Sequence, residues 1–86
     1  MTAKYSVLIK RSAQKELEAL PKEYLQKILR IIGQLTEEPR PAGCEKLSGQ
    51  EKYRIRKGPY RIVYSIEDEI LTVWVVKVAH RREVYR

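Results

Sequence analysis

The chain has 86 residues, with 18 Lys and Arg side chains against 11 Asp and Glu, which gives a formal net charge of +7. This length suits one domain, residues 1–86, and leaves no room for a second. A single cysteine, Cys44, excludes an intramolecular disulfide, and one Cys with one His cannot supply the ligands of a structural zinc site. The positive charge favours a polyanionic partner, either nucleic acid, an anionic membrane surface or an acidic protein, and does not choose among them.

The N-terminal part contains one short apolar stretch, from Tyr5 to Ile9. Its β-branched and aromatic residues predict a strand. It is too short for the core of a signal peptide or for a membrane span. Together with the lone thiol, this favours a protein of the reducing cytoplasm.

Two helices are expected after this strand. Ser12 is placed to cap the first helix, whose apolar residues recur at helical spacing as Ala13, Leu17 and Leu20. Pro21 suits the first turn of the second helix, where its missing N–H is not needed. The apolar stripe of the second helix comprises Tyr24, Leu25, Ile28, Leu29, Ile32 and Leu35.

After a loop rich in Pro and Gly, residues 39–52, the hydrophobic period changes from that of a helix to that of a strand. The predicted strands are Tyr53 to Arg56, Tyr60 to Ile66, and Leu71 to Ala79. The two connections between them are short enough for hairpins. The expected fold is therefore α+β: an N-terminal strand, a helical hairpin and a three-stranded antiparallel meander, with the helices on one face of the sheet.

Side-chain alternation sorts the residues of these strands onto two faces. If the apolar stripes meet the helices, Arg54, Arg56 and Arg61 emerge together on the uncovered face. In the last strand, Trp74, Val76 and Val78 would then point to the helices. The residues expected on the uncovered face of that strand are Val75, Lys77 and Arg81.

This clustering of cations has two interpretations. An open sheet face must be polar, and Arg meets that need with its stem lying over the sheet. Alternatively the face binds phosphate, because ordinary surfaces intersperse both signs of charge and the planar guanidinium grips phosphate through two hydrogen bonds. Nearby acids are few in the sequence: Glu51 precedes the cluster and Glu83 follows it.

Nearly the whole chain resembles the RelE branch of the RelE/ParE superfamily of bacterial and archaeal toxins. The matching segments are YSVLIKRSAQKELEALP, KLSGQEKYRIRKGPYRIVYSI and LTVWVVKVAHRREVYR. The more specific signatures are YRIR-x-G-x-YRIVY and HRREVY, whereas the helical half is generic. The resemblance implies a RelE-like domain with a sheet like that of microbial RNases.

The same resemblance implies the toxin of a type II toxin–antitoxin system, an mRNA interferase that cuts messenger RNA in the A site of the ribosome. It implies no metal and no cofactor. The implied partners are the ribosome with its mRNA and an acidic, helical, RelB-like antitoxin, through which the complex binds operator DNA. By motif, the resemblance makes Arg61 and Arg81 catalytic arginines, Tyr85 the tyrosine that closes the site, and Arg54 and Arg56 a basic pair beside the substrate phosphates.

The remaining candidates have less definite roles. His80 is a candidate general acid or base, although strand parity points it towards the helices. Glu83 is a candidate base or a neutralising partner of Arg82. Further candidate phosphate ligands are Lys57, Lys77 and Arg82.

RNA carries its own nucleophile, because the 2′-OH can attack the adjacent phosphorus to give a 2′,3′-cyclic phosphate. The arginines would stabilise the charge that develops on the phosphoryl oxygens, and Tyr85 would stack on a base or lend its hydroxyl. Two alternatives share the fold. One is a ParE-like toxin that inhibits DNA gyrase, and the other is a non-catalytic module whose basic face binds nucleic acid or protein.

Overall fold

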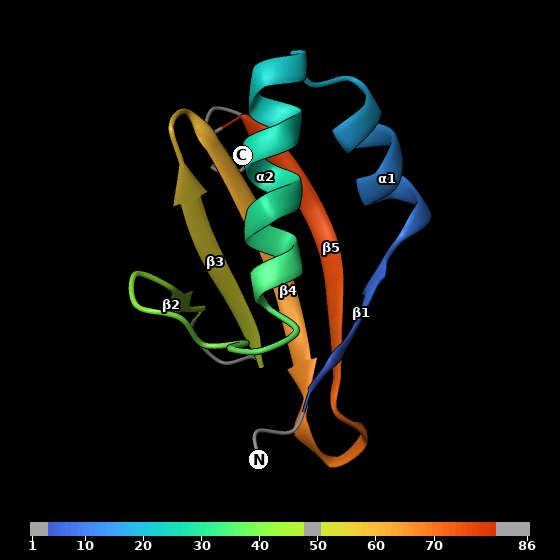
Figure 1. Ribbon diagram of the computed structural model, residues 1–86, viewed down its shortest axis with the longest axis vertical. Helices are drawn as coiled ribbons and strands as arrows, with labels where there is room; N and C mark the ends of the chain where they lie inside the picture. Colours follow the sequence, from blue (N-terminus) through green and yellow to red (C-terminus); the bar gives the residue numbers. More distant parts are fainter. Residues whose placement is uncertain (1–3, 48–50, 81–86) are drawn as a thin grey trace.

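The structure is a computed structural model that describes residues 4–47 and 51–80 (Figure 1). The chain first forms the strand β1 (Ser6–Ile9) and the helices α1 (Arg11–Glu18) and α2 (Lys22–Gln34). It continues through the strands β2 (Glu45–Lys46), β3 (Lys52–Lys57) and β4 (Tyr60–Glu67), a 3₁₀ turn η1 (Asp68–Ile70) and the strand β5 (Thr72–His80). The predicted order of elements is confirmed, and β2 is an added short strand inside the segment expected to be a loop.

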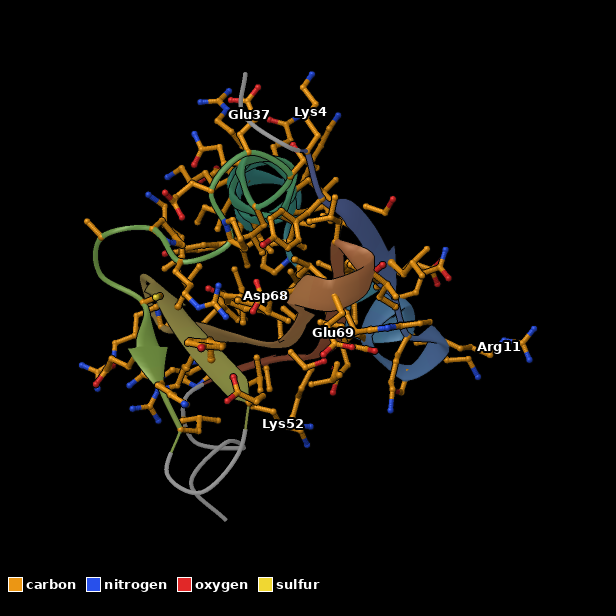
Figure 2. The ribbon with its side chains drawn as sticks, turned by 90° about the horizontal axis from the view of Figure 1, so that it is seen from below. Lys4, Arg11, Glu37, Lys52, Asp68 and Glu69 are labelled. Carbon is orange, nitrogen blue, oxygen red and sulfur yellow. The ribbon has the colours of Figure 1, made fainter. Side chains whose placement is uncertain are left out.

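The described strands form one sheet in the order β1-β5-β4-β3-β2. β3, β4 and β5 make the expected antiparallel meander, β2 pairs antiparallel with β3, and β1 runs parallel to β5. Both helices lie on the same side of this sheet (Figures 1 and 2). The other side is an open face, and the α+β fold class is confirmed.

The hydrophobic core lies between the helices and the covered face of the sheet. It consists of Ala13, Leu17, Ile28, Ile32, Leu35, Tyr53, Ile62, Tyr64, Ile66, Val73, Val75 and Val78. Leu29 was expected in this stripe but is 45% exposed. Ile28, Ile32 and Leu35 already supply the contact face of α2 at helical spacing, and Leu29 lies outside that arc.

The prediction that Ser12 caps the first helix was wrong. The N-cap of α1 is Lys10, and no side chain caps it. The N–H of Lys10 donates to the Val75 carbonyl at 2.9 Å, at the end of the β1–β5 pairing. Its own carbonyl then accepts the first helical bond, from Gln14 N–H at 2.8 Å. Sheet pairing therefore fixes where α1 begins.

A β-bulge in the last strand overturns part of the predicted side-chain alternation. Val63 pairs with Lys77 while Tyr64 pairs with Val75, so Val76 is an extra residue in β5. Val75, expected on the open face, is fully buried in the core. Trp74 and Val76, expected to face the helices, lie on the open face instead. One inserted residue reverses the facing of every residue before it.

The two hairpins close with different turns. Between β3 and β4 the connection is Gly58-Pro59, and Gly58 has a φ of +57°, a left-handed conformation that suits glycine. Between β4 and β5, η1 is followed by Leu71 with a φ of +48°. No helix in residues 4–47 and 51–80 is long and apolar enough to cross a membrane.

Candidate nucleic-acid interface

Three arginines share the open face of the sheet, as predicted. Arg54 on β3 lies directly opposite Val63 on β4, and Arg56 lies directly opposite Arg61. Arg61 in turn faces Ala79 on β5. Directly opposite residues of an antiparallel pair have Cα atoms about 4.5–5.5 Å apart, so the strands hold Arg56 and Arg61 side by side.

This arrangement runs against the stability of the sheet. Like charges placed directly across a strand pair repel each other. Arg61 is also only 6% exposed, which removes most of the water that would screen its charge. A local conflict of this kind is expected where side chains are arranged for function. Two guanidinium groups held side by side are suited to bind one phosphate.

The structure adds an acid that the sequence did not indicate. Glu45 on β2 forms ion pairs with Arg54, at 3.4 Å from Nη2, and with Arg56, at 3.3 Å from Nε. β2 is only two residues long, and no strand pattern in the sequence marks it. Glu45 thereby offsets part of the repulsion among these guanidinium groups.

Other predicted site residues are not brought together with these arginines. Lys57 lies opposite Tyr60, and Tyr60 lies opposite His80, so these three belong to the helix-covered face. The His80 ring meets the Tyr60 ring edge-on, with centroids 5.7 Å apart. Strand alternation thus places His80 and Lys57 on the opposite face of the sheet from Arg61.

Lys77 is directed to the edge of the sheet. Its ammonium lies 3.1 Å from Glu16 Oε2 on α1, while Glu16 Oε1 accepts a 2.9 Å hydrogen bond from the N–H of Val78. β1 has already ended at Ile9 by this level, so Glu16 takes the place of a strand partner for β5. This one carboxylate holds the part of β5 that leads to Ala79 and His80.

The remaining predicted residues, Arg81, Arg82, Glu83 and Tyr85, lie outside the described residues. His80 is the last described position, and it follows Ala79, the β5 residue opposite Arg61. Within the described ranges, no group of three or more His, Cys, Asp or Glu side chains is placed to hold a metal ion.

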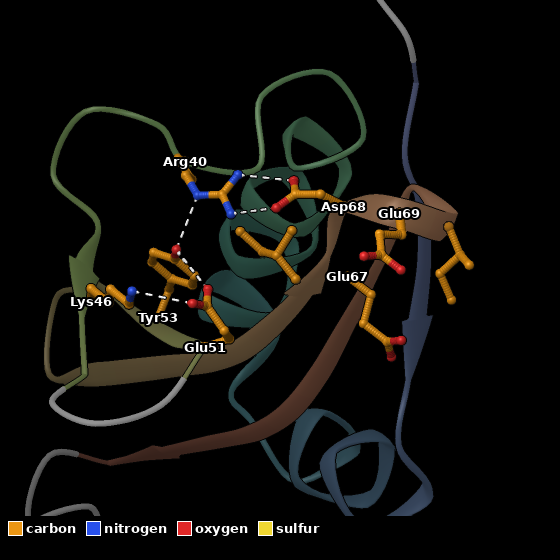
Figure 3. Close-up of a pocket in the computed structure, with 9 residues that line it drawn as sticks. Arg40, Lys46, Glu51, Tyr53, Glu67, Asp68 and Glu69 are labelled. Carbon is orange, nitrogen blue, oxygen red and sulfur yellow. Dashed lines mark hydrogen bonds and ion pairs between the residues drawn. The ribbon is translucent and has the colours of Figure 1, made fainter.

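At the opposite end of the sheet, a hollow of about 590 Å³ contains a hydrogen-bonded network (Figure 3). Arg40 makes a two-pronged ion pair with Asp68, at 2.8 and 3.1 Å, and its Nε donates to the Tyr53 hydroxyl at 3.0 Å. Tyr5 donates to the same carboxylate at 2.7 Å. The hydrogen bonds from Arg40, and then from Tyr5, lower the pKa of Asp68 to about 2. The network anchors the connection that leads to β2 and hence to Glu45.

Comparisons with known proteins show which family the chain is similar to. Residues 7–85 match the family described as the ParE toxin of the type II toxin–antitoxin system parDE. Toxin RelG of Mycobacterium tuberculosis is 34% identical over 86 residues, covering 95% of this chain and 97% of that protein.

Solved structures give the same relationship. The archaeal RelE–RelB complex from Pyrococcus horikoshii OT3 has a chain with a TM-score of 0.83 and 31% identity, covering 91% of this chain and 96% of that one. The isolated Escherichia coli RelE toxin has a TM-score of 0.79 and 30% identity, covering 94% of this chain and 90% of that one. The RelBE2 toxin–antitoxin complex of M. tuberculosis has a chain with a TM-score of 0.79 and 31% identity, covering 91% of this chain and 99% of that one.

Proposed function

The chain belongs to the RelE/ParE superfamily of type II toxin–antitoxin toxins, and on that premise we propose that it is an mRNA interferase, a metal-independent endoribonuclease that cuts messenger RNA in the ribosomal A site. The observation that carries this proposal is the pair Arg56 and Arg61, held directly opposite each other on the open face. Arg54 extends the same cationic surface along β3. A single phosphate of an RNA strand fits between such paired cations.

The reaction uses the substrate's own nucleophile. The 2′-OH gives up its proton as its oxygen forms a bond to the adjacent phosphorus. The bond from phosphorus to the 5′-oxygen breaks and that oxygen takes up a proton, leaving a 2′,3′-cyclic phosphate and a 5′-OH. Arg61 stabilises the charge that grows on the phosphoryl oxygens. Electrostatic stabilisation of this kind is usually the largest single contribution to catalysis. Arg81 and Tyr85, by their position in the sequence after β5, are proposed to complete the site. His80 faces the helices, so it is given no contact with the phosphate.

The proposed partner in the cell is an antitoxin. Relatives of this fold were solved as RelE–RelB and RelBE complexes, which supports a protein inhibitor for this chain as well. The net charge of +7 suits an acidic one. Cytoplasmic location and the ribosome as the site of action follow from the same proposal.

The test adds purified protein to a translating extract and maps the 5′ ends of the message. Arg61→Ala is expected to reduce A-site cleavage by about 100- to 1,000-fold, the usual cost of removing one donor from a charged transition state. Arg30→Ala removes the same side chain from an exposed position of α2 and should cleave like the wild type. Both variants are first checked for cooperative unfolding in urea.

Cleavage by Arg61→Ala at the wild-type rate would refute the nuclease proposal. The matching family is described as the ParE toxin, and this observation supports the alternative of a gyrase inhibitor. That alternative predicts intact message together with gyrase-dependent DNA damage. Toxicity that Arg61→Ala leaves unchanged, with neither cut message nor gyrase-dependent DNA damage, would favour the non-catalytic module.

A further inference from the structure

A hollow of about 310 Å³ on the open face of the sheet takes no part in the arginine site. It is lined by Lys10, Lys52, Ser65, Glu67, Trp74 and Val76. Trp74, Ser65 and Lys52 form one row across β5, β4 and β3, because Trp74 lies opposite Ser65 and Ser65 lies opposite Lys52. Figure 2 shows Lys52 on the side of the sheet that faces away from α2.

This row continues the line of arginines along the sheet. On β3, Lys52 is two residues from Arg54 and four from Arg56, all with the same facing. At about 3.3 Å per residue, Lys52 lies about 7 Å from Arg54 and about 13 Å from Arg56. The open face of β3 therefore presents a cation at every second residue, as a track for an extended polyanion requires.

Trp74 is the aromatic member of this track. It is the only tryptophan of the chain, and the bulge at Val76 turns it away from the core onto the open face. There it is partly exposed, and across the sheet it lies opposite Leu8 of β1, which is 44% exposed. An indole that is reachable by solvent and flanked by lysines has the composition of a base-stacking platform.

We infer that this hollow is a stacking subsite for single-stranded RNA whose reacting phosphate lies between Arg56 and Arg61; the inference rests on the proposed function. One base of the strand stacks on the Trp74 indole. Lys52 and Lys10 bind the flanking phosphates, and Ser65 offers a hydroxyl to the base edge. Among the described residues that line the hollow, Glu67 is the one carboxylate, and it accepts a hydrogen bond from a base amino group while two lysines outweigh its charge.

The experiment uses the single tryptophan as its own probe. A short 2′-O-methyl RNA oligonucleotide, which lacks the nucleophile and is not cut, is titrated into the full-length protein. Saturable quenching of the indole emission is expected. Binding is also followed by the anisotropy of a labelled oligonucleotide, so that variants without tryptophan can be compared. Trp74→Phe should keep most of the affinity, whereas Trp74→Leu should bind about 5- to 100-fold more weakly, the usual loss for one stacked base.

Charge is tested with a matched pair of lysines. Lys52→Ala is expected to weaken binding and to reduce its salt dependence, whereas Lys22→Ala, at an exposed position of α2, should change neither. Urea unfolding of each variant separates lost binding from lost folding. Leu and Phe are both apolar, but only Phe has an aromatic ring on which a base can stack. Equal RNA affinities of Trp74→Leu and Trp74→Phe would therefore overturn the stacking role.

Two further outcomes would overturn the subsite. One is RNA binding by anisotropy with unchanged indole emission, which leaves the arginine site and the nuclease proposal intact. The other is an indole response to an acidic helical peptide but not to RNA, which would make this face a protein-docking surface. Failure of the nuclease proposal is recognised separately, by A-site cleavage that Arg61→Ala leaves unchanged.

Discussion

Gly58 allows the first hairpin to pack closely against α2 because it has no side chain. Its φ of +57° lies in the region where a side chain is strained. A Cβ built at this position would also stand 2.9 Å from Cε1 of Tyr24 on α2. Tyr24 packs against Tyr60, with ring centroids 5.0 Å apart. One glycine thus allows the turn and the contact between α2 and the start of β4 at once.

Gly58→Ala is therefore expected to lower the free energy of unfolding by about 1–3 kcal/mol, measured by urea denaturation. Gly33→Ala is the matched control, because Gly33 lies in α2 with nothing within 4 Å of the added Cβ. That change should stabilise the protein by about 0.5–1 kcal/mol, since alanine favours helix. Equal effects of the two substitutions would show that neither the turn nor Tyr24 constrains position 58.

β5 is the element on which the site depends most. Its first half is flanked by β1 and β4, and its second half has Glu16 of α1 in place of β1. The bulge at Val76 lies between these halves and turns Trp74 outwards. The second half sets the position of Ala79 opposite Arg61. The anchoring of β5 by Glu16 is thus expected to support the arginine site indirectly.

Removing this anchor tests the idea. Glu16→Ala leaves the Val78 N–H without its acceptor and is expected to cost about 1–3 kcal/mol of stability. Glu16→Gln keeps an oxygen for Val78 but loses the ion pair with Lys77, so it should cost clearly less. Amide hydrogen exchange of Val78 measures the difference directly, and faster exchange is expected for the alanine variant. Similar exchange in both variants would contradict the anchoring role.

Across the whole molecule, two clusters of charged side chains lie at the two ends of the sheet. The arginine pair lies towards the Gly58 turn, whereas the Asp68 network lies at the opposite hairpin. That network joins Tyr5, Arg40, Tyr53 and Asp68, residues far apart in the sequence. Figure 3 shows Arg40 between Tyr53 and Asp68. Side-chain hydrogen bonds thereby join distant segments at one end of the sheet, while the other end carries the arginine pair.

The network predicts a pH dependence of stability. The pKa of Asp68 is lowered from 3.8 to about 2 by its hydrogen bonds from Arg40 and Tyr5, so its contribution is complete above about pH 4 and is lost as the pH falls through about 2. Asp68→Asn should lower the melting temperature at pH 7, and its gap to the wild type should close between about pH 4 and pH 2. Thermal unfolding followed by circular dichroism measures this gap. Glu69→Gln, in the same hollow, should stay near the wild type, and a gap for Asp68→Asn that persists at pH 2 would rule out the ion pair as its cause.

The sequence by itself determined both helices, the strands β1, β3, β4 and β5, their order and the fold class, because helical and strand periodicity reflect which residues must leave water. It also placed Arg54, Arg56 and Arg61 on one face, since strand alternation is a local property of the backbone. The motifs that these residues belong to identified the family, which the comparisons confirm.

Only the tertiary structure decided the facing of Trp74, Val75 and Val76, the pairing of Glu45 with two arginines, and the anchoring of β5 by Glu16. Each of these depends on a partner distant in the chain or on one extra residue in a ladder. Local periodicity carries no information about such register, because a bulge costs little where the apolar residues on both sides of it still reach the core.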